Sequence, residues 1–276
     1  MTADETPIEV WVERAKGGDK AALEAVVLDI QDRVYNLALR MLWMPADAED
    51  ATQEILIKVV THLSQFAGRS AFMTWVYRVA TNHLLTTRAR HAELAMRQED
   101  TTADAFIPAL PAPNHGELPE PHLLLTEMQN HCTLGMLLCL DRELRVAFIL
   151  GVGFNVSGEE GAAITGTTPA AFRKRLSRAR ERLRAIMDGK CNFVNPEVSC
   201  SCTRLIGFAE QVTELFGDVR TVPLDLRAPL APHHAEMVEL DRITALFRSH
   251  PTYAAPDAFV TAVRALLASD RFALLS

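Results

Sequence analysis

The chain has 276 residues, of which 49% are hydrophobic and 23% are charged, and its formal net charge is −7. This composition is typical of a globular protein with one or two cores, and the negative charge excludes a protein that coats nucleic acid non-specifically, because neutralising phosphates requires concentrated lysine and arginine. No apolar run reaches the roughly 18 residues of a membrane span, and residues 1–10 do not resemble a signal peptide, so we expect a cytoplasmic protein without membrane insertion.

Apolar residues recur at helical spacing along nearly the whole chain, and no sustained alternation of the kind that a sheet needs is present. The sequence therefore predicts an all-α fold. Residues 5–92 should form a first helical domain. Asp19 is placed to cap its long second helix, which should stop before Pro45, and a turn at Gly68 should separate the third helix from the fourth.

Five prolines lie between residues 108 and 121, where they remove backbone donors and favour an extended chain. Together with several acidic residues they predict a flexible acidic linker over residues 93–121. A second helical domain should follow at residues 122–188. Residues 189–276 should hold a cysteine-containing segment and a small helical extension, which is either a stabilising cap or a built-in regulator.

Two helix start signals in series predict a helix-turn-helix inside the second domain. Ser157 and Glu160 have the spacing of a capping box, in which each side chain bonds to the backbone of the other residue. After a tight turn, Thr168 followed by Pro169 marks the start of the next helix. Gly161 falls inside the first of these helices, where glycine costs about 1 kcal/mol relative to alanine, so we expect that helix to be weakened.

The second helix of this pair should expose a basic face. Between Arg173 and Arg184 the only acidic residue is Glu181, whereas a solvated face normally mixes both signs. The pattern therefore indicates nucleic-acid binding, with residues near the helix start at base edges and later arginines on phosphates. The candidate DNA-contacting residues are Thr168, Pro169, Arg173, Lys174, Arg175, Arg178 and Arg180.

The third helix of the first domain carries a polar face made by Asp50, Gln53, Glu54 and Lys58. Several acceptors on one helix surface suit a basic protein partner better than DNA. An ordinary solvated face would show the same residues, so both interpretations stay open.

Aromatic residues near the start of the fourth helix are candidates for contact with an unstacked base. Phe72 and Trp75 offer flat apolar surfaces, and Arg69, Arg78 and Asn82 add charge and hydrogen-bonding groups. Either ring could equally be packed in the core.

Three motifs occur in one order along the chain, at Asp47–Ile55, Phe66–Asn82 and Phe172–Arg180. The motif at Asp47 resembles the segment by which sigma factors hold the clamp helices of the largest polymerase subunit. The motif at Phe66 resembles their promoter-melting segment, and the motif at Phe172 is similar to the helix that reads the minus-thirty-five element. Together they resemble the extracytoplasmic-function (ECF) sigma factors of the sigma-70 family, over about residues 9–92 and 123–187.

This resemblance implies a region 2 helical bundle and a region 4 helix-turn-helix, in a protein that is no enzyme and needs no cofactor. Its partners would be core RNA polymerase and promoter DNA. Regulation would come from an anti-sigma factor or from the chain's own C-terminal extension, for which the minimal two-domain family has no counterpart. The polymerase contacts would come from Asp50, Gln53, Glu54 and Lys58. The minus-ten contacts would come from Arg69, Ser70, Phe72, Thr74, Trp75, Arg78 and Asn82. The minus-thirty-five contacts would come from the DNA-contacting set given above, Thr168 to Arg180.

Cys191, Cys200 and Cys202 directly follow the basic helix, and three thiolates could bind zinc or sense oxidation. Their spacing fits no standard zinc ribbon and no fourth ligand is obvious, so small buried thiols are the alternative. A stand-alone helix-turn-helix regulator and a redox- or metal-responsive thiol protein therefore remain as other hypotheses. No activating histidine lies beside the cysteines in sequence, which disfavours a thiol enzyme.

Overall fold

The computed structural model describes residues 7–87, 129–130, 132–192, 194–198 and 239–255, together with residues 261 and 265. Within these ranges every regular element is a helix, which confirms the predicted all-α fold. None of these helices combines the length and the apolar character that crossing a membrane requires. The predicted linker at residues 93–121 lies outside the described residues.

The first group of helices comes from the N-terminal part of the chain. Its elements are α1 (Ile8–Lys16), α2 (Lys20–Leu42), α3 (Pro45–Thr61), the 3-10 helix η1 (Leu63–Gln65) and α4 (Phe72–Thr86). Asp19 caps α2 as predicted, because its carboxylate accepts a hydrogen bond from the Ala22 amide at 3.0 Å. Pro45 opens α3 in the first turn, where its missing N–H removes no helical hydrogen bond.

The second group follows from residue 132. Its elements are a helical stretch at 132–136, the 3-10 helix η3 (Leu137–Cys139), α8 (Arg142–Phe148), the π-helical turn η4 (Ile149–Gly153), α9 (Gly158–Thr165) and α10 (Pro169–Lys190). Ser157 and Glu160 form the predicted capping box at the start of α9. The Thr168 hydroxyl accepts a hydrogen bond from the Ala171 amide at the start of α10. Helices α9 and α10 are joined by Gly166, whose φ of +65° suits glycine.

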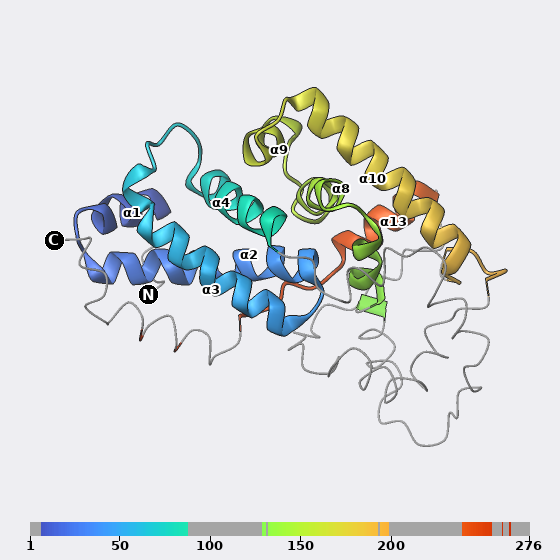
Figure 1. Ribbon diagram of the computed structural model, residues 1–276, viewed down its shortest axis with the longest axis horizontal. Coiled ribbons are helices and arrows are strands. Elements are labelled where there is room, and N and C mark those ends of the chain that lie inside the picture. The colour runs from blue at the N-terminus through green and yellow to red at the C-terminus, as the bar shows by residue number, and fades with distance from the viewer. Residues whose placement is uncertain are drawn as a thin grey trace, which may run out of the picture.

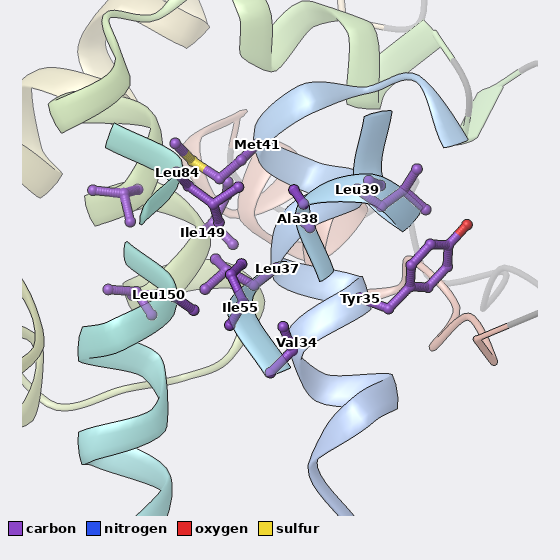
Figure 2. Close-up of a cluster of buried hydrophobic side chains, with 14 of the residues drawn as sticks. Val34, Tyr35, Leu37, Ala38, Leu39, Met41, Ile55, Leu84, Ile149 and Leu150 are labelled. Carbon is purple, nitrogen blue, oxygen red and sulfur yellow. The ribbon is translucent and has the colours of Figure 1, made fainter. Parts of the chain in front are cut away.

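The two groups lie side by side and share one hydrophobic core (Figure 1). Every residue from Val34 to Trp43 is buried, so this part of α2 has no solvent-facing side. Figure 2 shows one side of this stretch: Val34, Leu37 and Met41 lie toward Ile55 of α3, Leu84 of α4, and Ile149 and Leu150 of η4, whereas Tyr35 and Leu39 point the other way. The second group therefore helps to cover one side of the C-terminal half of α2.

Two arginines of α8 bind the C-terminal ends of helices in the first group. The Arg145 guanidinium is fully buried and donates to the Met41 carbonyl near the end of α2, at 2.5 Å. Arg142 donates to the Leu84 carbonyl near the end of α4 at 3.0 Å, and also to that of Thr87. The last carbonyls of a helix lack hydrogen-bond donors within the helix and lie at the negative end of its dipole. Each arginine therefore supplies both the missing donor and a favourable positive charge.

Gly161 of α9 lies against the ring of Phe172 from α10. A Cβ atom added at Gly161 would come within 2.3–2.5 Å of three atoms of that ring, which is itself fully buried. The glycine lets the two helices approach closely. The sequence predicts a cost in helix stability at Gly161, and the structure adds a packing reason for the glycine: the helix-turn-helix requires a residue without a side chain there.

We expect Gly161→Ala to lower the free energy of unfolding by about 1–3 kcal/mol, as overpacked cores do. Alanine is the better helix former by about 1 kcal/mol, but the buried Phe172 ring cannot move aside without displacing its own neighbours. Gly189→Ala in α10 is the matched control, since no atom of the described residues lies within 4 Å of its added Cβ atom. Urea unfolding followed by circular dichroism measures both variants, and equal stability of the two would contradict this account.

Candidate functional site

The basic face of α10 is turned outward. Arg173, Lys174 and Arg178 are exposed, whereas the opposite face of the helix is buried. The buried side chains are Phe172, Ala179, Leu183 and Met187. Sequence periodicity predicts the first part of this buried face correctly. The helix continues to Lys190, so that the whole basic segment belongs to one helix.

Other residues of the predicted DNA-contacting set are less exposed or make contacts within the protein. Arg175 pairs with Glu143 of α8, with 2.8 Å between Nη2 and Oε2, and is only partly exposed. Arg180 is half-buried, and its buried Nε has no hydrogen-bond partner among the described residues. The hydroxyl of Thr168 caps the helix, and Pro169 is its first residue. Of the predicted set, Arg173, Lys174 and Arg178 thus have their charges most available to a ligand.

A second candidate surface lies on α3, where Asp50, Gln53, Glu54 and Lys58 are all exposed, as the sequence suggested. Asp50, Glu54 and Lys58 border a groove between α3 and the end of α4, and Gln53 is their neighbour on α3. The groove is lined by Leu42, Asp47, Asp50, Ala51, Glu54, Lys58, His83, Thr86 and Thr87. We call this lining, with Gln53, the acidic groove, because its carboxylates outnumber its one lysine.

His83 of α4 is a member of the acidic groove that the sequence did not point to. Its Nδ1 lies 2.6 Å from the Lys58 Nζ, and its Nε2 lies 3.7 Å from the Glu54 carboxylate. Burial lowers the pKa of His83, and the nearby Lys58 lowers it further. The imidazole is therefore neutral at neutral pH and leaves the groove acidic. It belongs to another helix, so no spacing on α3 could have revealed it.

A third candidate surface surrounds the start of α4. The ring of Trp75 lies 5.8 Å from that of Phe72 and 5.6 Å from that of Phe66, measured between centroids. Phe72 is fully buried, so its ring supports Trp75 and is not itself on the surface. Trp75 and Thr74 are half-buried. The remaining predicted residues, Arg69, Ser70, Arg78 and Asn82, are exposed.

Helix α4 also contacts the helix-turn-helix directly. The ring of Tyr77 stacks on that of Phe154, which precedes α9, with 5.4 Å between the centroids. Figure 1 shows α4 facing α8 and α9 across the junction of the two groups. Helix α4 is therefore held against α9, the helix that precedes the basic helix α10.

Of the three cysteines singled out in the sequence, only Cys191 is described, and it is buried at the end of α10. Cys200 and Cys202 lie outside the described residues. Among the residues that the structure places, no group of three or more histidine, cysteine, aspartate or glutamate side chains is arranged to hold a metal ion.

Comparison with known proteins finds a sigma-70 family model and several sigma factors that this chain is similar to. The family described as sigma-70 region 2 matches residues 26–93. The RNA polymerase sigma-H factor of Pseudomonas aeruginosa is 33% identical over 178 residues, which are 62% of this chain and 89% of the relative. The ECF RNA polymerase sigma-E factor of Escherichia coli K12 is 33% identical over 183 residues, which are 63% of this chain and 91% of the relative. More than a third of the present chain thus lies beyond each match.

Proposed function

Because the chain belongs to the ECF group of the sigma-70 family of RNA polymerase sigma factors, we propose that it binds core RNA polymerase and directs it to specific promoters. The observation that carries this proposal is the presence, on separate helical groups of one chain, of the acidic groove and of an outward-facing basic helix. The first suits a protein partner and the second suits DNA. The protein works in the cytoplasm, needs no cofactor and leaves the chemistry of RNA synthesis to the polymerase.

The acidic groove is the proposed contact with core polymerase. Asp50, Gln53, Glu54 and Lys58 are exposed there, and a neutral His83 does not offset the carboxylates. A basic helix of the partner that enters the groove would exchange hydration for charge-assisted hydrogen bonds.

The surface around α4 is the proposed contact with the minus-ten element. Trp75 is backed by two buried rings and so offers a rigid apolar surface on which an unpaired base can stack. Arg69, Ser70, Thr74, Arg78 and Asn82 supply charge and hydrogen bonds around it. Phe72 contributes by positioning Trp75. Since an unpaired base costs a few kcal/mol to expose, capture of that base favours the melted promoter.

The basic face of α10 is the proposed contact with the minus-thirty-five element. Arg173, Lys174 and Arg178 face outward near its N-terminal half, where base edges are read in helix-turn-helix proteins. Thr168 and Pro169 set the start of the helix, Arg175 fixes it to Glu143 of α8, and Arg180 is the half-buried member of the set. Regulation by a separate anti-sigma factor or by the C-terminal extension completes the proposal.

Reversing the charge of the acidic groove tests the contact with polymerase. We expect the double variant Asp50→Lys, Glu54→Lys to bind core RNA polymerase at least about tenfold more weakly, because close charge pairs across interfaces are worth about 1.5 kcal/mol or more. The control is Glu9→Lys, Asp29→Lys, which changes the net charge equally at exposed positions on α1 and α2. Fluorescence anisotropy with labelled protein gives both affinities.

The same two variants are then compared in promoter-dependent transcription with purified core polymerase. The groove variant should lose activity in proportion to its affinity, and the control variant should keep it. Unchanged polymerase binding by the groove variant would refute the proposed contact and would favour a stand-alone DNA-binding regulator.

A further inference from the structure

Three side chains of α2 bind the backbone of an extended segment from near the C-terminal end of the chain. The Arg40 guanidinium donates to the Pro251 carbonyl at 3.2 Å. The Asn36 amide donates to the Tyr253 carbonyl at 2.6 Å and accepts from the Tyr253 N–H at 3.0 Å. The carboxylate of Asp32 accepts from the Ala255 N–H at 2.9 Å. We call Asp32, Asn36 and Arg40 the ladder.

The spacing of the ladder matches that of an extended chain. Its members are one helical turn apart, so that each step of four residues advances about 6 Å along α2. Two residues of extended chain advance about 6–7 Å. Alternate residues of the segment therefore meet successive members of the ladder, while the side chains of Thr252 and Ala254 point outward and are exposed.

The segment is built into the fold. Tyr253 is 1% exposed, and the ladder residues Asn36 and Arg40 are 3% and 6% exposed. Arg40 also lies over the ring of Phe154, 5.4 Å from its centroid, and over that of Tyr253 at 5.9 Å. Arg40 thus joins the first group of helices, the helix-turn-helix group and the C-terminal segment at one point.

The preceding residues bind the second group of helices. Phe247, in α13 (Glu239–Arg248), packs edge-on against Phe148 of α8 at 5.0 Å between centroids. Nε2 of the buried His250 lies 2.7 Å from the Thr133 hydroxyl, and Arg248 donates to the Asn155 side chain at 3.3 Å. Burial lowers the pKa of His250 to about 3, so the ring stays neutral in this contact. Residues 239–255, which we call the strap, therefore contact both groups (Figure 1).

We call the arrangement in which the two groups of helices share one core the closed arrangement. In it, the protein cannot contact both promoter elements at once. Elements centred near minus ten and minus thirty-five are about 25 base pairs apart, or roughly 85 Å at about 3.4 Å per base pair. Helix α4 contacts the helix-turn-helix directly, and α10, with 22 residues, is only about 33 Å long. Residues 88–128, about 40 in number, could span on the order of 130 Å when extended, so the chain is long enough for the two groups to separate.

We propose that the strap is a built-in lock, which holds the two groups closed by docking residues 251–255 on the ladder and must leave it before the protein engages a promoter. The lock itself follows from contacts within this chain, and only its effect on transcription rests on the proposed sigma-factor function. When only the open state of a protein binds its partner, the apparent affinity is reduced in proportion to the fraction of molecules that are open. Release of the strap should therefore strengthen polymerase binding without any change in the interface.

The test uses two variants of the full-length chain that differ only in which face of the strap they change. The release variant carries Tyr253→Ser and Ala255→Pro. These substitutions remove the buried ring of Tyr253 and the Ala255 N–H, which donates a hydrogen bond to Asp32. The control variant, Thr252→Ser, Ala254→Pro, makes similar changes at the two exposed positions between them. Asp32→Ala, at a half-buried position, is a milder release variant that removes one contact of the ladder. Circular dichroism and urea unfolding establish that each protein is folded.

Small-angle X-ray scattering of the free proteins reports the lock, and titration with core RNA polymerase reports its consequence. We expect the release variant to have a larger radius of gyration and to bind core polymerase about tenfold more tightly, with Asp32→Ala in between and the control variant like wild type. A folded release variant with the radius and affinity of the control overturns the lock. Failure of every protein, wild type included, to bind core polymerase would refute the proposed function, whereas the scattering would still decide the lock.

Discussion

Replacing Arg145 with leucine should lower the free energy of unfolding by about 3–5 kcal/mol, the cost typical of breaking a buried charged network. The side chain is fully buried, and its partners among the described residues include four main-chain carbonyls. These belong to Met41, Leu137, Leu138 and Leu140. Leucine can bond to none of them, and each carbonyl left unpaired in the core costs about 1–3 kcal/mol.

Urea unfolding, with circular dichroism as the probe, measures the loss. Arg33→Leu is the matched control, because Arg33 lies on the exposed side of α2 and surface substitutions usually change stability by less than about 0.5 kcal/mol. If Arg145→Leu cost less than about 1 kcal/mol, Arg145 would not be the connection between α2 and α8 that its contacts imply.

The largest effect on DNA binding should come from the outward face of α10. We expect the double variant Lys174→Ala, Arg178→Ala to bind a promoter fragment at least about 30-fold more weakly, since each base contact is worth about 1–3 kcal/mol. Alanine preserves the helix, so that the loss reports on contacts and not on folding. To the extent that these side chains bind phosphates, the slope of log affinity against log salt should also become shallower, by about one for each lost contact.

Fluorescence anisotropy at several salt concentrations gives both quantities. The control is Lys20→Ala, Arg33→Ala, which removes the same charge from exposed positions on α2. Equal weakening by the two double variants would mean that net charge, and not the face of α10, governs DNA binding.

The features that the sequence predicts well are local ones. The Asp19 cap, the capping box of Ser157 with Glu160, and the Thr168–Pro169 start each depend on residues within one helical turn. Their chemistry can therefore be recognised without knowledge of the rest of the fold. The buried Phe172, Ala179 and Leu183 of α10 follow from periodicity for the same reason, whereas further along the helix Met187 is buried in place of the expected Ile186.

The features that the sequence does not predict depend on contacts between distant segments. From the sequence, Gly161 is predicted only to weaken α9. Its packing role depends on the ring of Phe172, which belongs to the next helix. Asn36 and Tyr253 are 217 positions apart, and a polar residue on each turn of α2 resembles an ordinary solvated face. His83 joins the acidic groove in the same way, from α4. Such residues show their roles only once the helices are placed.

The shared core has a thermal consequence. Separation of the two groups uncovers apolar side chains, among them Leu84, Ile149 and Leu150, and the attraction between apolar surfaces near room temperature is mainly entropic. Opening should therefore resemble a partial unfolding, with a positive change in heat capacity, and the apolar part of the closed arrangement should weaken on cooling. Temperature alone would then shift the population of molecules ready to engage polymerase, with no change in any contact to it.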